Sequence, residues 1–142
     1  LQTALEYTSD KRIRSGILVT MGSNRETNLR DDAAALEAYR QNFELAGRIG
    51  SADQFRCVQG AARILTRRGE FDEALATLHR ANIEKLRGFW RHSMLAALGD
   101  TLAAAGRKDE ALKAFGDLVE DESAAAGHRR EAEERIEHLK QK

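Results

Sequence analysis

One segment of this chain occurs twice, at a distance that limits the folds open to it. GEFDEAL begins at Gly69, and GRKDEAL begins at Gly106, 37 residues further along (from 69 to 106). A sequence that repeats every 20 to 50 residues or so is typical of stacked supersecondary units, each too small to bury its apolar face alone. The flanking helices match at the same distance: Val58, Ala61, Ala62, Leu65 and Leu78 correspond to Leu95, Leu98, Gly99, Leu102 and Phe115.

The apolar residues of the chain recur with the spacing of α-helices. After Ser51, for example, Phe55, Val58 and Leu65 share one helical face. No segment alternates with a period of two over the length of a strand, and the chain has no proline, the strongest helix breaker. The sequence therefore predicts an all-α fold, with helices over residues 1–7, 10–21, 31–46, 51–68, 72–87, 90–105, 109–119 and 127–140.

Glycine and polar residues predict where these helices begin and end. Gly69 and Gly106 are expected to end helices in the left-handed conformation that glycine adopts without strain. Asp72 and Asp109 are expected to cap the helices that follow. Residues 22–24 (Gly-Ser-Asn) are expected to break the second helix and open a loop that runs to residue 30. The other expected boundary residues are Asn28 or Asp31 before the third helix, Gly47 and Gly50 after it, and Ser51 with Gln54 as a capping box for the fourth.

Small residues stand where two helices of one unit would approach closely. Ala62 and Gly99 occupy this position in one helix of the pair, and Ala74 and Ala111 in the other. With the glycine turns and the period, these residues resemble the tetratricopeptide repeat, a helical pair of about 34 residues. The resemblance implies a right-handed α-solenoid of stacked antiparallel hairpins that spans the whole chain as one domain.

The resemblance divides the chain into units. Two repeats are expected at residues 55–88 and 92–125, with residues 89–91 inserted between them. A degenerate repeat is expected at residues 10–50, and the charged segment 127–142 is expected to be a capping helix. The degenerate repeat is placed by three matches: Ala35, Leu36 and Tyr39 correspond to Ala74, Leu75 and Leu78.

The first helix carries a short apolar stripe of Leu1, Ala4 and Leu5. We interpret it as the end of a preceding hairpin, so that the chain is expected to be the C-terminal part of a longer protein. Two alternatives stay open. The stripe could pair with a second copy and form a homodimer scaffold, or the repeats could serve as an internal spacer.

The resemblance also implies a binding surface, because repeats of this family bind partners along the groove of their first helices. Three of its residues, Arg56, Arg63 and Arg67, share one side of a helix, and a row of guanidinium groups suits the carboxylates of an acidic peptide. In the alternative interpretation, these arginines pair with Asp and Glu of their own chain. The expected groove residues are Arg56, Gln59, Arg63, Thr66, Arg67, Ser93, Ala96, Asp100, Ala103 and Ala104.

The aromatic residues are expected to be structural. Phe89 and Trp90 are expected to be buried between two hairpins, although an exposed Trp90 would be an interface anchor. Tyr39 and Phe43 are predicted core residues. Cys57 is predicted to be a small buried apolar residue, since no base can be named that would activate it.

Composition narrows the function further. Lys plus Arg and Asp plus Glu number 23 each, which gives no basic surplus for nucleic acid or an anionic membrane. An RNA-binding repeat that uses the arginine row is therefore the weaker alternative. No catalytic, phosphate-binding or metal-binding motif occurs, so we expect a non-catalytic protein that needs no cofactor or metal. A single cysteine fits a reducing compartment such as the cytoplasm and leaves the compartment open.

Overall fold

The computed structural model describes residues 1–45 and 49–142, and it is all-helical. Helix makes up 78% of it, and no strand occurs among the described residues, which confirms that the fold is all-α. Gly47, the expected end of the third helix, lies outside the described residues. The helices are α1 (Gln2–Glu6), α2 (Lys11–Thr27), α3 (Asp32–Glu44), α4 (Ala52–Arg67), α5 (Phe71–His79), η1 (Ile83–Lys85), α6 (Gly88–Ala104), α7 (Lys108–Glu120) and α8 (Ala126–Lys140).

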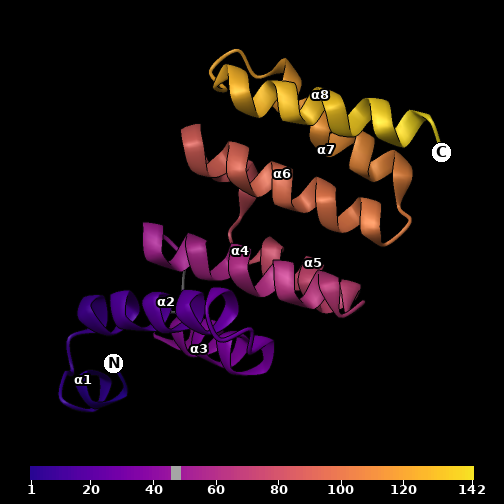
Figure 1. Cartoon of the computed structure of the whole chain (residues 1–142). Coiled ribbons are helices and arrows are strands. Elements are labelled where there is room, and N and C mark those ends of the chain that lie inside the picture. The colour runs from indigo at the N-terminus through magenta and orange to yellow at the C-terminus, as the bar shows by residue number, and fades with distance from the viewer. Residues whose placement is uncertain (46–48) are drawn as a thin grey trace.

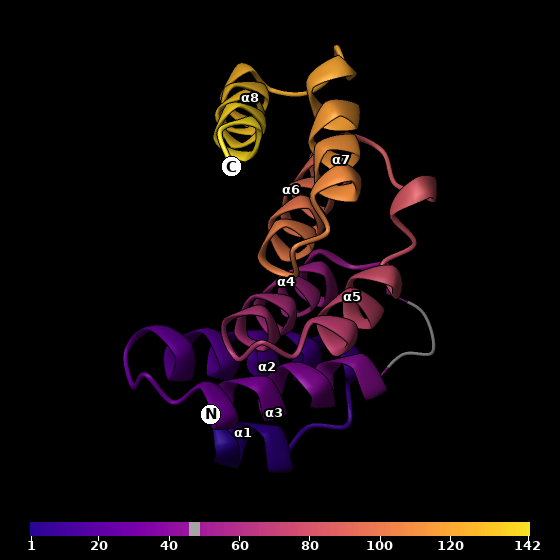
Figure 2. The ribbon, with the colours of Figure 1, turned by 90° about the vertical axis from the view of Figure 1, so that its right-hand side faces the viewer.

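Each helix packs against the next one along the chain, and the even-numbered helices also contact one another in succession. Figure 1 shows α2, α4, α6 and α8 one above the other. Turned by 90°, the same stack shows α7 beside α6 and α5 beside α4 (Figure 2). Helices α3, α5 and α7 therefore cover one side of α4 and α6. Within the row of even-numbered helices, α4 contacts α2 and α6, and α6 contacts α4 and α8.

Several predicted helix ends are confirmed. Gly69 and Gly106 follow α4 and α6 with φ of 76°, in the left-handed region. Ser51 and Gln54 form the capping box before α4. The backbone N–H of Gln54 donates to Ser51 Oγ, and Gln54 Oε1 accepts from the backbone N–H of Ser51. Asp31 caps α3 by accepting a hydrogen bond from the amide of residue 34 at 3.0 Å. Local sequence rules therefore place these boundaries correctly.

Gly22 does not break a helix, which corrects the prediction for residues 22–30. Helix α2 continues through this glycine to Thr27, and the turn before α3 is short. The physical reason is packing: a Cβ on Gly22 or on Gly60 would overlap the ring of Tyr39. Tyr39, from α3, is 2% exposed and lies between a glycine of α2 and a glycine of α4. The close approach of three helices explains both glycines.

Helix α5 ends earlier than predicted. It stops at His79, and η1 follows after Asn82, which has a left-handed φ of 53°. Gly88 begins α6 instead of ending α5, so residues 89–91, expected between two repeats, lie in the first turn of α6. Asp72 and Asp109 are not caps either; they lie in the first turns of α5 and α7, where carboxylates favour the helix dipole.

The core runs through most of the described chain. Its largest cluster extends from α3 to α8 and includes the predicted core residues Tyr39 and Phe43. Gly99 confirms the expected close approach, because a Cβ there would overlap the Phe115 ring of α7. A smaller cluster joins α1 to α2 and α3: Leu5 is 5% exposed and packs with Leu18. Leu5 is therefore covered within its own chain, whereas Leu1 remains exposed.

Candidate functional site

A cleft of about 350 Å³ lies between α4 and α6, on the face turned away from α5 and α7. Its floor is made of small side chains, and its walls carry charge of opposite sign, with arginines on α4 and Asp100 on α6. The structure brings seven of the ten predicted groove residues together here. They are Gln59, Arg63, Thr66, Arg67, Ser93, Ala96 and Asp100, joined by Ala62, Ala97 and Thr101.

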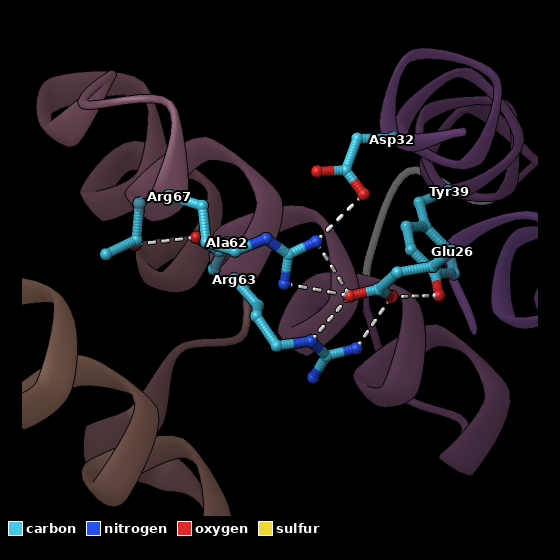
Figure 3. Close-up of polar contacts among 7 residues, drawn as sticks. Glu26, Asp32, Tyr39, Ala62, Arg63 and Arg67 are labelled. Carbon is cyan, nitrogen blue, oxygen red and sulfur yellow. Dashed lines mark hydrogen bonds and ion pairs between the residues drawn. The ribbon is translucent and has the colours of Figure 1, made fainter. Parts of the chain in front are cut away.

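Glu26 of α2 binds two of the predicted arginines (Figure 3). Arg63 donates to both of its carboxylate oxygens, from Nε at 2.7 Å and from Nη2 at 2.8 Å. Arg67 donates to the same carboxylate at 3.2 Å and to Asp32 at 2.9 Å. The hydroxyl of Tyr39 donates a further hydrogen bond of 3.0 Å to Glu26. Arg63 and Arg67 thus pair with carboxylates of their own chain, as the alternative interpretation of the row expected.

This network shifts the pKa values of its members. Partial burial raises the pKa of the Glu26 carboxyl. The hydrogen bonds and charge of Arg63, together with the hydrogen bonds of Tyr39 and Arg67, outweigh this effect and hold that pKa below its usual range. The hydrogen bond to Glu26 raises the pKa of the Arg63 guanidinium. Burial, and then the Glu26 charge, raise the pKa of the Tyr39 hydroxyl. Glu26 therefore stays ionised at neutral pH and binds α2 to α4.

We expect Glu26→Gln to lower the free energy of unfolding by about 1–2 kcal/mol at pH 7, because charge-assisted hydrogen bonds to half-exposed arginines are lost. A carboxyl whose pKa is lower in the folded state stabilises the fold above its unfolded pKa, near 4.5, and this contribution is lost as the pH falls through the folded pKa. Urea denaturation should therefore show a smaller difference between variant and wild type at pH 3 than at pH 7.

Glu133→Gln, on the exposed face of α8, is the matched control and should leave stability unchanged at both pH values. A difference between Glu26→Gln and wild type that is the same at pH 3 and pH 7 would show that the charge of Glu26 does not stabilise the fold.

The structure separates Arg56 from the other two arginines. Its guanidinium pairs with Asp53 at 3.6 Å and lies beside α2, outside the α4–α6 cleft. Asp100 stays in the cleft, but Arg135 of α8 donates to it at 2.8 Å. Ala103 and Ala104 line a different cavity, next to α8. The predicted groove is thus shorter than expected and lies at the junction of α4 with α6.

Trp90 and Phe89 differ in their surroundings. The Trp90 indole is half-buried and stacks on the Phe55 ring of α4, with the centroids 5.3 Å apart. It therefore joins α4 to α6, as predicted for a residue between two helix pairs. Phe89 is 60% exposed, so its predicted burial is wrong. Its ring lies edge-to-face against Trp90, with centroids 5.0 Å apart, and beside the His128 imidazole, at 5.6 Å.

A polar cluster that the sequence did not indicate fixes the segment between α7 and α8. The buried His92 of α6 hydrogen-bonds Asp121 through Nε2 at 2.8 Å, and the Ser123 hydroxyl donates to the same carboxyl group at 2.6 Å. The Ser123 hydrogen bond, and then that of His92, lower the Asp121 pKa to about 2. Because His92 lies in α6 and Asp121 follows the end of α7, only their spatial arrangement reveals the pair.

Cys57 lies apart from the cleft, in the core. Cys57 is fully buried, and burial raises the pKa of its thiol to about 12, which keeps it protonated, as expected for a structural residue. No group of three or more His, Cys, Asp or Glu side chains is placed to hold a metal ion within residues 1–45 and 49–142. In the same described part of the chain, no helix is long and apolar enough to cross a membrane.

Comparison with known proteins assigns no family to this chain. No protein-family model matches it, and no curated protein sequence matches it.

Proposed function

We propose that the chain is a tetratricopeptide-like repeat protein, a right-handed solenoid of helical hairpins that binds a segment of another protein without catalysis. Two features support the repeat architecture. The even-numbered helices contact one another in succession, and α2, α4 and α6 each also pack against the odd-numbered helix that follows. The units built on α4 and α6 share the left-handed Gly69 and Gly106 at the same position. In this proposal α8 is the capping helix.

The cleft between α4 and α6 is the observation that carries the binding proposal. Its floor contains Ala62, Ala96 and Ala97, whose short side chains leave room for the main chain of a bound peptide. The hydroxyls of Thr66 and Thr101 lie 3.0 Å apart at its base. Hydroxyl and amide side chains of this kind suit the N–H and C=O groups of an extended segment.

The charges of the cleft favour an acidic segment. The pairing with Glu26 leaves one nitrogen of each guanidinium group available to a ligand. In the part of the chain that the structure describes, Arg63 Nη1 and Arg67 Nε form no hydrogen bond. The side chains of Arg63 and Arg67 are 54% and 46% exposed. Pairing with Glu26 also fixes both guanidinium groups before a ligand arrives, which lowers the entropy lost on binding. We therefore propose that acidic side chains of the partner bind these remaining donors.

A display library of random 12-residue peptides, selected on the immobilised protein, tests the proposal. We expect the enriched peptides to be acidic and their affinity, measured by fluorescence anisotropy, to fall as salt is raised. Ala96→Trp would fill the cleft floor and should weaken binding by at least about tenfold. Ala76→Trp is the matched control, because Ala76 is exposed on α5, away from the cleft.

Failure to enrich any peptide would contradict the proposed function and favour a spacer or a self-association scaffold, which light scattering across a concentration series would reveal. Equal affinities for the two tryptophan variants would show that binding takes place outside the cleft.

A further inference from the structure

A second cavity, of about 560 Å³, lies on the side of α6 opposite to the cleft. Residues of α6 that line the cleft and residues that line this cavity alternate along the helix, so the two sites use opposite faces of α6. The cavity floor is apolar. It is formed by Leu95, Leu98 and Leu102 of α6, together with Ile83 and Ala114.

The early end of α5 explains why this cavity exists. Helix α3 has 13 residues, whereas α5 has nine. When Tyr39 is aligned with Leu78, the residue that corresponds to Phe43 of α3 is Asn82. Phe43 is 4% exposed and lies in the core shared with α4, but Asn82 lies in a left-handed turn at the cavity edge. In the preceding unit, Phe43 fills this position with an aromatic side chain of the chain itself. Beside α6 the equivalent position carries no such side chain, and the cavity lies there.

The side chains of the cavity floor are also less buried than the corresponding side chains of α4. At the corresponding positions of α4, Val58, Ala61 and Leu65 are 0%, 0% and 1% exposed. In α6, Leu95 and Leu102 are 4% and 5% exposed, and Leu98 is only half-buried. A cavity of this size, with an apolar floor and a polar rim, falls in the range of ligand-binding pockets, roughly 300–1,000 Å³.

The charges around the cavity favour a ligand that carries a positive charge. Three carboxylates and two cations lie at the rim, and both cations are engaged: Lys113 pairs with Asp117 at 3.3 Å, and Arg91 donates to the Ile83 carbonyl at 3.2 Å. Glu84 is exposed and forms no ion pair within the described residues. A cation from outside would therefore find Glu84 available.

We propose that this cavity is a docking site for a protein partner that inserts one aromatic side chain and places a lysine or arginine beside Glu84. The aromatic ring would cover Leu95, Leu98 and Leu102, as the chain's own Phe43 helps to complete the preceding unit. The site is separate from the α4–α6 cleft and does not rest on the function proposed for it.

Methyl NMR of the full chain, with labelled leucine and isoleucine, tests the proposal. The probe is the dipeptide N-acetyl-Phe-Lys-amide, and the controls are N-acetyl-Phe-Glu-amide and N-acetyl-Gly-Lys-amide. We expect the Phe-Lys probe to cause saturable shifts of the Leu95, Leu98 and Leu102 methyls, and Phe-Glu to bind about threefold more weakly, as for one exposed ion pair. Gly-Lys should cause no saturable shift.

Three variants sharpen the test. Leu98→Trp fills the cavity and should abolish the shifts, with circular dichroism to verify folding. Glu84→Lys changes an exposed side chain, so it should fold normally and should reverse the preference to Phe-Glu. Ala96→Trp blocks only the cleft and should bind the Phe-Lys probe as wild type does. Absence of saturable shifts in wild type, equal binding of Gly-Lys, or a preference that Glu84→Lys leaves unchanged would overturn the proposal.

Discussion

Tyr39→Ala is expected to lower the free energy of unfolding by about 3–5 kcal/mol, the largest effect of any single change considered for this chain. Tyr39 is 2% exposed and fills the space between α2 and α4, where Gly22 and Gly60 leave no side chain of their own. Removing the ring would open a cavity that two glycine-bearing helix surfaces cannot fill. The loss compares with about 5–15 kcal/mol for the stability of a whole domain.

Two further variants separate the parts of this effect in urea denaturation. Tyr39→Phe keeps the ring and removes only the hydrogen bond to Glu26, so it should cost about 1–2 kcal/mol. Tyr7→Ala is the matched control, because Tyr7 is 86% exposed and its removal should change stability by less than about 0.5 kcal/mol. If Tyr39→Ala were no more destabilising than Tyr39→Phe, the ring would not be what holds α2, α3 and α4 together.

Gly60→Ala is expected to destabilise the fold by about 2–3 kcal/mol, even though alanine is the better helix former by about 1 kcal/mol. The added Cβ would overlap the Tyr39 ring, which cannot move aside because Gly22 borders its other face and its hydroxyl binds Glu26. Gly116→Ala, in α7, is the control: a Cβ there meets nothing within 4 Å, so it should stabilise the fold by about 0.5–1 kcal/mol.

A double-mutant cycle identifies the cause of the Gly60→Ala effect. In a Tyr39→Leu background the smaller side chain leaves room for the new methyl group, so Gly60→Ala should cost much less there. Leucine is the natural choice, since Leu78 occupies the corresponding position of α5. An equal cost of Gly60→Ala in both backgrounds would mean that the close contact with Tyr39 is not its source.

The sequence predicted those features that depend on neighbours along the chain. The all-α class followed from apolar periodicity, and the glycine turns and capping box followed from local backbone chemistry. Gly22 was misinterpreted because a glycine inside a helical pattern can mark either a break or a close helix contact. Only Tyr39, in the next helix, decides between the two.

The candidate site was predicted in part for a similar reason. Gln59, Arg63 and Ser93 were placed in one groove by the resemblance to the repeat family, and they do line one cleft. The pairing of Glu26 with Arg63 was missed, since residues 22–30 were expected to form a loop. No local signal marked the pair, because Glu26 and Arg63 lie on separate helices, 37 residues apart.

The length of α5 could not be predicted from periodicity. Its apolar pattern continues to Leu86, but Asn82 adopts a left-handed conformation that ends regular packing. Whether the chain leaves a helix at such a point depends on tertiary contacts, here the burial of Ile83 in η1. The cavity beside α6 is a consequence of this early end.

Chemical-shift mapping of a display-selected acidic peptide on the ¹⁵N-labelled protein tests the central claim most directly, because it locates the bound segment without any substitution. We expect the largest amide shifts at saturation to fall along the cleft, at Gln59, Arg63, Ser93, Ala96 and Asp100. Shifts confined to the outer face of α8, or spread without order over the chain, would contradict the claim that the junction of α4 and α6 is a binding site.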